Sequence, residues 1–281
     1  MKLEKISDRV FANTEGKGGG NAGIIVLDNQ TVVVDAMYTR PGEEFRRAIE
    51  ETSPKATRYL LLTHSHRDHV FGNQAFRDCE VVAHASLKAR MQELLKTEWS
   101  PEGLDKYFSE LRETDPERLS QLEGVEITLP TKTFDRRFVV EDDELTVEME
   151  HVGGHTVGSS IVYFPREATL FTGDLVFAKT FPWGGDPTAD PNEWMEALRK
   201  MLEMRVDVII PGHGPICDKE EVEAYLRFFE EVKEKMGALM AQGKPEEEIT
   251  NYENYPAFYG TDRANWPGDS LKRWYEVWRE D

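Results

Sequence analysis

The segment of residues 63–69, THSHRDH, constrains the fold of this chain more than any other feature. It directly follows the apolar run Tyr59–Leu62, which has the pattern of a buried strand. It contains four potential metal ligands, namely His64, His66, Asp68 and His69. A polar turn is an improbable source of this pattern, because three of only seven histidines in 281 residues fall in it. A strand end holds side chains rigidly at one sheet edge, as a metal site requires.

Three later segments repeat the arrangement of an apolar strand, a glycine and a residue able to bind metal. His155 lies in the glycine-flanked loop GGHTVG, Asp174 ends the strand of FTGD, and His213 follows the strand of IPGHG. Glycine lets the backbone turn tightly and approach an ion closely. Each segment alone is weak evidence, because a buried histidine or aspartate is often only hydrogen-bonded. Together they predict that these side chains converge on one sheet edge. Imidazole and carboxylate suit zinc, iron or manganese.

The order of these motifs, HxHxDH, GHT, GD and GHG, resembles the metallo-β-lactamase superfamily over residues from about 8 to 220. The resemblance implies an α/β fold, an αβ/βα four-layer sandwich with the metals at one edge of two sheets. It also implies a ligand set. His64, His66 and His155 would hold the first metal, Asp68, His69 and His213 the second, and Asp174 would bridge them. The implied cofactors are two Zn²⁺ ions, with iron or manganese as alternatives.

The rest of the chain reads as two β-rich halves that each carry helices. Strands are predicted at 9–13, 22–28, 31–35, 59–62, 81–83, 145–150, 159–164, 168–172 and 206–210, and helices at 43–51, 86–96, 191–203 and from about 219 to Gly243. Asp190 as N-cap and Pro191 mark a clean helix start. We expect one domain over 1–281, with a helical insertion near 97–124 and a C-terminal helical, aromatic-rich extension over 244–281.

Composition limits the partners of this protein. The net charge of −19 repels polyanions, so nucleic acid is not an expected partner. No apolar run approaches the length of a membrane span, and the first ten residues, MKLEKISDRV, lack the apolar core of a secretory signal. Cys79 and Cys217 form no CxxC pattern and fit a reducing compartment, although one disulfide is compatible with the sequence. The expected location is cytoplasmic, and the expected partner is a small-molecule substrate.

The implied chemistry is hydrolysis, in which two metals activate a shared water as the nucleophile. Asp68 would orient this nucleophile and carry its proton, and is therefore the candidate catalytic residue. The fold alone does not select the substrate. The presence of Asp174 disfavours a dedicated β-lactamase, and His66 in place of glutamate disfavours a diiron reductase. A small ester, lactone, thioester or β-lactam-like substrate is expected. The alternatives are a phosphodiesterase, an iron-dependent oxidoreductase or persulfide dioxygenase, and a binding protein that keeps the metals for structure.

Three stretches are candidates for shaping the pocket: Gly16–Gly20 as a flap, residues 177–190 with Phe181 and Trp183, and the aromatic residues between 252 and 278. The apolar, aromatic character of these stretches favours a neutral or modestly polar acyl substrate. None of them carries the clustered basic residues that would clamp a phosphate or carboxylate. The C-terminal aromatics suit internal packing better than substrate contact, with a homodimer interface as the alternative.

Three further polar residues lie outside the implied ligand set. His84 and His151 are expected to be hydrogen-bonded or exposed and not to bind metal. Arg67 lies between ligands and suits either a substrate anion or a surface salt bridge.

Overall fold

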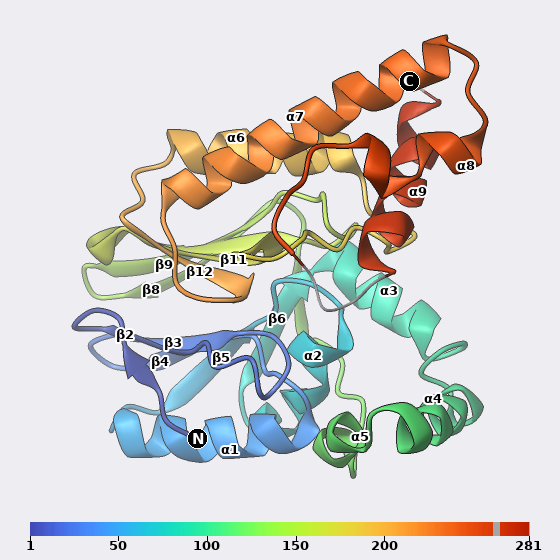
Figure 1. Cartoon of the computed structure of the whole chain (residues 1–281). Helices are drawn as coiled ribbons and strands as arrows, with labels where there is room; N and C mark the ends of the chain where they lie inside the picture. The colour runs from blue at the N-terminus through green and yellow to red at the C-terminus, as the bar shows by residue number, and fades with distance from the viewer. Residues whose placement is uncertain (261–264, 281) are drawn as a thin grey trace.

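The computed structural model describes residues 1–260 and 265–280. Two β-sheets lie face to face in the middle of the molecule, and helices cover the outer face of each (Figure 1). This arrangement confirms the predicted αβ/βα four-layer sandwich. Residues 261–264 and 281 of the predicted C-terminal extension lie outside the described residues.

The first sheet is built from the N-terminal half of the chain, and its strands follow chain order. They are β1 (Glu4–Lys5), β2 (Val10–Asn13), β3 (Ala22–Val26), β4 (Thr31–Val34), β5 (Thr57–Leu61), β6 (Glu80–His84) and β7 (Lys132–Phe134). Strands β1 to β4 pair antiparallel, and β4 to β7 pair parallel. The parallel strands end at the same edge, where the short helices α2 (Arg67–Val70) and η1 (Phe71–Phe76) begin. Helices α1 (Thr39–Thr52) and α3 (Ala85–Leu94) supply apolar side chains to the core on the outer side of this sheet.

The second sheet is built from the C-terminal half, in the order β12-β11-β10-β9-β8. Its strands are β8 (Arg137–Asp142), β9 (Leu145–His151), β10 (Ser160–Phe164), β11 (Thr169–Phe177) and β12 (Val208–His213), with η2 (Pro165–Glu167) between β10 and β11. Helices α6 (Pro191–Glu203) and α7 (Lys219–Ala241) cover its outer face (Figure 1). The predicted start of α6 is confirmed, because the Asp190 side chain accepts hydrogen bonds from the amides of Asn192 and Glu193.

The alternation of side chains along each strand creates the layers. Neighbouring residues of a strand point to opposite faces. Val33 and Leu60 pack in the core that contains Phe45 of α1, whereas their neighbours Val32 and Leu61 pack in a second core between the sheets. The second core contains apolar residues of both sheets: Ile25, Val34 and Val82 of the first, and Val147, Val162, Phe171 and Ile210 of the second. Both sides of the strands are therefore dry, which explains their continuous apolar runs.

Helices also occupy the two regions set apart by the sequence. Residues 97–124 contain α4 (Pro101–Thr114) and α5 (Pro116–Leu122), and the C-terminal region contains α8 (Glu246–Ile249), η3 (Tyr252–Asn254) and α9 (Trp266–Trp278). Trp274 of α9 is buried against Phe229 of α7, with ring centroids 4.7 Å apart. The organisation of residues 1–281 as one domain stays a prediction, which the shared core between the sheets supports. None of the described helices is long and apolar enough to cross a membrane. Both cysteines are free thiols.

The structure differs from the sequence prediction at several strands. Strands β1, β7 and β8 were not predicted, because they are short or rich in charged residues and lie at or near sheet edges. Strand β11 was predicted to end at Thr172 but continues to Phe177. Gly173 adopts a φ of 52°, and the pairing of β11 with β12 shifts register on both sides of it. This irregularity keeps β11 paired beyond the glycine, so Asp174 lies inside the strand and not at its end.

Candidate metal centre

The structure brings the seven predicted ligands together at one edge of the two sheets. His64 and His66 follow β5, Asp68 and His69 belong to α2, His155 lies in the loop before β10, Asp174 belongs to β11, and His213 ends β12. They form two neighbouring sets, His64–His66–His155–Asp174 and Asp68–His69–His213. Within each set the potential ligand atoms lie within 4.8 Å of one another.

Distances in the first set match those between ligands of one metal ion. Nδ1 of His66 lies 3.0 Å from Nε2 of His155. Oδ2 of Asp174 lies 3.4 Å from Nε2 of His64 and 3.5 Å from Nε2 of His155. Four ligand atoms about 2.1 Å from a tetrahedral ion are separated by about 3.4 Å. This set could therefore hold one ion without rearrangement.

The second set is joined to the first by Asp174. Oδ2 of Asp68 and Nε2 of His213 are 3.3 Å apart, and Oδ2 of Asp174 lies 3.4 Å from the same nitrogen. The other oxygen of Asp174, Oδ1, lies 3.1 Å from Nε2 of His69. Asp174 thus faces the ligand atoms of both sets, as a bridging carboxylate would.

Several buried polar atoms at this centre lack a hydrogen-bond partner among the described residues. They include Nε2 of His64, Nε2 of His69 and Oδ1 of Asp174. The last two approach within 3.1 Å without hydrogen-bond geometry. Leaving buried polar atoms unpaired is costly, and proteins usually avoid it. Because these atoms are also the predicted ligand atoms, the donor set fits metal ions.

The charges at the centre suit cations. Burial and the charge of His69 lower the pKa of His64 to about 4, so this imidazole is neutral and able to bind metal. Burial favours a neutral Asp174, but the surrounding histidines outweigh it and hold the pKa of this carboxyl well below its usual range. Burial likewise opposes a charge on His213, but Asp174 and Asp68 raise the pKa of His213 to about 9. Without metal, this proton partly compensates the two carboxylates.

Two aspartates that the sequence analysis did not assign hold the histidines in place. Asp35 accepts hydrogen bonds from the backbone amide and hydroxyl of Thr63, at 2.8 and 2.7 Å, and lies 2.9 Å from Nδ1 of His69. Asp186 lies 3.1 Å from Nε2 of His66. Asp35 directly follows the apolar run of β4, the same signal that marks the other motifs, so the sequence offered a sign of it. No pattern marks Asp186 within its loop.

The glycine-rich loop of residues 16–20 supports the centre and is not part of the pocket wall. The backbone N–H of Gly20 donates to the carbonyl of Asp68. A Cβ atom on Gly20 would lie 2.2 Å from the ring of His69, and one on Gly19 would lie 2.7 Å from Cβ of Asp68. The loop therefore packs directly on two predicted ligands, and this contact requires glycine. A role of this loop as a flap stays a prediction, and its residues are not among those that line the pocket.

A pocket of about 510 Å³ opens onto the centre and exposes His66, Asp68, Asp174 and His213. Its aromatic walls include Trp99, Tyr107, Trp183 and Trp266. The ring of Trp183 lies 5.2 Å from that of His66. Phe181, a sequence candidate for shaping the pocket, is instead fully buried against Phe228 of α7 and does not line the pocket.

The structure also shows the positions of His84, His151 and Arg67, which lie outside the implied ligand set. His84 and His151 stack with ring centroids 3.6 Å apart, and each also has a backbone carbonyl within hydrogen-bond distance. Both are hydrogen-bonded, as expected, and neither belongs to a described ligand set. Arg67 combines the two alternatives, because it pairs with Glu98 at 2.6 Å and also lines the pocket.

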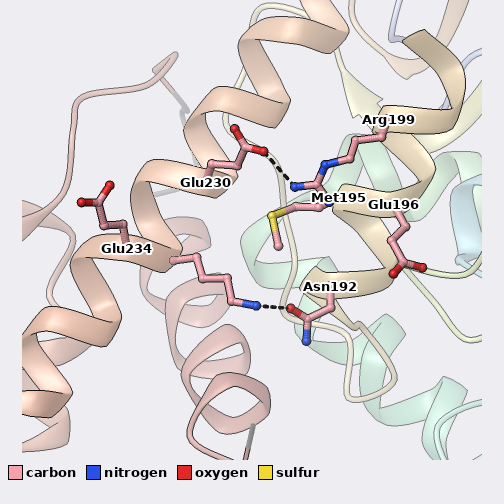
Figure 2. A pocket seen from close by; sticks show the side chains of 7 residues that line it. Asn192, Met195, Glu196, Arg199, Glu230 and Glu234 are labelled. Atoms are coloured by element: carbon pink, nitrogen blue, oxygen red, sulfur yellow. Dashed lines mark hydrogen bonds and ion pairs between the residues drawn. The ribbon is translucent and has the colours of Figure 1, made fainter. Parts of the chain in front are cut away.

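A second hollow lies between α6 and α7 and contains none of the seven predicted ligands (Figure 2). Two pairs of its polar groups bind each other: Arg199 donates to Glu230 at 2.8 Å, and Lys233 donates to Asn192 at 2.6 Å. The predicted ligands gather instead at the pocket beside the sheet edge, so the metal centre is the candidate functional site.

Comparison with known proteins agrees with this geometry. Residues 16–213 match the model of the metallo-beta-lactamase superfamily, and the chain belongs to this superfamily. It is 25% identical to the beta-lactamase-like protein 2 homolog of Caenorhabditis elegans, over 89% of this chain and 76% of that protein. It is also 25% identical to a linear primary-alkylsulfatase of a Pseudomonas species, over 73% of this chain but only 42% of that protein. The solved structure of the sec-alkylsulfatase Pisa1 from a Pseudomonas species covers 98% of this chain and 50% of its own, with a TM-score of 0.73 and 16% identity.

Proposed function

We propose that this protein is a dinuclear metal-dependent hydrolase that acts on a small acyl substrate, such as an ester, lactone, thioester or β-lactam-like compound. The observation that carries the proposal is the position of Asp174. Its Oδ1 faces His69, while its Oδ2 faces His64, His155 and His213. A carboxylate with ligand atoms of two sets around it supports a bridged pair of ions, and two Zn²⁺ ions suit this imidazole and carboxylate set.

In the proposed mechanism the chain holds the ions and positions the reactants. Two bound ions would lower the pKa of a shared water towards neutrality and polarise the carbonyl under attack. Asp68 has 20% of its side chain exposed, at the pocket, and would orient the water and accept its proton. Asp35 and Asp186 would hold the rings of His69 and His66 in the orientation that ligation needs. The aromatic walls would exclude water from the apolar part of the substrate.

Sulfate-ester hydrolysis is a second candidate. The sequence similarity to an alkylsulfatase favours it, as do the arginines that line the pocket. Phosphodiester hydrolysis and iron-dependent redox chemistry on the same ligands are further alternatives. These alternatives predict different substrates or a different metal. A metal analysis and a comparison of substrates therefore separate all of these functions.

The first experiment is metal analysis of protein loaded and then desalted. Wild-type protein is expected to retain two transition-metal ions per chain, and His155→Ala and His213→Ala about one each, because each variant removes a ligand from one set only. His84→Ala is the matched control and is expected to retain both ions, since His84 lies outside both sets. At most one ion in folded wild-type protein would contradict the bridged site, and a requirement for iron would favour redox chemistry.

The second experiment compares kcat/KM for p-nitrophenyl esters, a lactone, a thioester, a β-lactam, p-nitrophenyl sulfate and bis-p-nitrophenyl phosphate. We expect several acyl substrates to be hydrolysed and β-lactam turnover to be weak. A phosphate or sulfate ester that exceeds every acyl substrate by more than about tenfold, equivalent to ~1.4 kcal/mol, would replace the acyl proposal.

A further inference from the structure

Three arginines line the wall of the pocket beside the metal centre. They are Arg67 of α2, Arg90 of α3 and Arg118 of α5. The protein carries 53 acidic and only 34 basic residues, so a group of three arginines around one pocket differs from the acidic composition of the chain. No local sequence pattern marks this group. The three arginines are far apart in sequence and meet only in the fold.

These arginines are held in place and are only partly solvated. Their side chains are 28%, 19% and 26% exposed, respectively. The guanidinium of Arg67 lies over the ring of Tyr107, 4.6 Å from its centroid. Burial opposes the charge of Arg118, but the neighbouring Tyr38, Tyr107 and Asp115 raise the pKa of its guanidinium above its usual value. A partly buried cation that is already ordered, as Arg67 is over Tyr107, binds an anion at little further ordering cost.

Each of these arginines has a carboxylate nearby, but that carboxylate occupies only part of the donor capacity of the guanidinium. Arg67 pairs with Glu98 at 2.6 Å, Arg90 with Glu93 at 3.4 Å and Arg118 with Asp115 at 3.3 Å. A guanidinium has five N–H donors, so one carboxylate does not satisfy it. The Nε atoms of Arg67 and Arg90 are buried without a hydrogen-bond partner among the described residues.

The acidic residues of the same pocket are all engaged. Glu98 pairs with Arg67 but takes up only part of the donor capacity of that guanidinium. Asp68 and Asp174 belong to the ligand sets, and Asp186 lies against His66. Asp269, on the α9 side, accepts a hydrogen bond from Asn265. The arginine wall therefore faces the interior of the pocket as its cationic side.

We propose that Arg90 and Arg118, with Arg67, bind a carboxylate on the substrate that is separate from the bond being cleaved. This inference rests on the proposed hydrolase function and specifies its substrate as an anionic acyl compound with an apolar body. It replaces the expectation of a neutral substrate. The metal centre would hold the reacting carbonyl, the aromatic walls the apolar body, and the arginines the distant carboxylate.

The test compares two esters that differ only in this carboxylate, mono-p-nitrophenyl adipate and p-nitrophenyl hexanoate. Wild-type enzyme is expected to prefer the adipate ester. Arg90→Gln and Arg118→Gln are expected to lower kcat/KM for the adipate ester at least about tenfold and to leave the hexanoate unchanged, because each removes a charge-assisted hydrogen bond. Arg112→Gln is the matched control, since Arg112 is exposed in α4 and does not line the pocket.

Further measurements separate the possible failures. Thermal unfolding of each variant checks its fold, and Arg90→Lys and Arg118→Lys should keep part of the preference. Equal losses on both esters, or no loss on either, would overturn the proposal. A loss confined to p-nitrophenyl sulfate would show that the arginines bind the reacting group instead.

If neither ester is hydrolysed, the carboxylate-binding site is still testable without turnover. Adipate binding to metal-loaded protein can be followed by tryptophan fluorescence, because Trp99, Trp183 and Trp266 line the pocket. At least about tenfold weaker binding to Arg90→Gln and Arg118→Gln than to wild type would support the carboxylate site. Equal binding would exclude it.

Discussion

Oδ2 of Asp35 lies 2.9 Å from Nδ1 of His69, whose other ring nitrogen lies 3.1 Å from Asp174. A carboxylate behind an imidazole fixes the tautomer that leaves Nε2 free to bind metal. Asp35 also accepts two hydrogen bonds from Thr63, directly before His64. One buried side chain at the end of β4 thus orients the beginning and the end of the histidine cluster.

Asp35→Asn is expected to weaken binding of the second metal about 10- to 100-fold. The reason is that the neutral amide lacks the negative charge with which the carboxylate supports the His69 imidazole. Asparagine tolerates the left-handed backbone of this residue, whose φ is 59°, so the fold should survive. Competition with a chelating dye measures the affinity. Asp28→Asn is the control, since Asp28 pairs with Arg9 at the surface. Unchanged affinity in Asp35→Asn would show that the carboxylate has no role in metal binding.

Asp68→Ala is expected to nearly abolish turnover while the protein remains folded. The substitution removes a proposed ligand and the group proposed to orient the attacking water. Steady-state kinetics and circular dichroism check the two parts of this prediction. A variant that keeps more than about a tenth of the wild-type kcat has lost less than ~1.4 kcal/mol of barrier lowering, and the role assigned to Asp68 would then be wrong.

Gly20→Ala is expected to disturb the second ligand set from outside it. The added Cβ would lie 2.2 Å from Cε1 and Nε2 of His69, so either the ring or the loop must move. We expect loss of about one metal ion per chain and a lower unfolding temperature. Gly237→Ala has open space around its Cβ, lies within α7 and should be neutral or stabilising, since alanine is the better helix former. Full metal content in Gly20→Ala would mean that the loop yields without affecting His69.

Metal binding at pH 7 is expected to release protons. In the metal-free protein burial opposes the charge of His213, but Asp174 and Asp68 outweigh it and raise the pKa of His213 to about 9. The same carboxylates overcome burial to raise the pKa of His69 well above its usual value. Both imidazoles are therefore protonated at pH 7 and must lose a proton to bind metal, and this release should decline as the pH rises through about 9.

Calorimetry in buffers of different ionisation enthalpy measures the number of protons released. His213→Ala should release fewer than wild type. An observed enthalpy that does not depend on the buffer would contradict the protonated state assigned to these residues.

The sequence by itself determined the sandwich and the candidate ligands. Period-two and continuous apolar patterns mark strands because burial acts on every residue of a strand, and glycine marks the turns that approach the centre. Each candidate ligand stands next to such a pattern, so His64 to His69, His155, Asp174 and His213 could be selected without coordinates. Asp35 carried the same signal after β4. Strands β7 and β8 were not predicted, because β7 has only three residues and charged residues flank the short apolar run of β8.

Only the tertiary structure decided what surrounds these ligands. Asp186 reaches His66 across 120 positions of sequence, and Gly20, in the loop before β3, meets His69 of α2. Arg67, Arg90 and Arg118 line one wall through the packing of three helices, although nothing in their spacing connects them. Local patterns report which face of an element is buried. They do not report which distant side chains share a cavity, because that depends on the relative placement of whole elements.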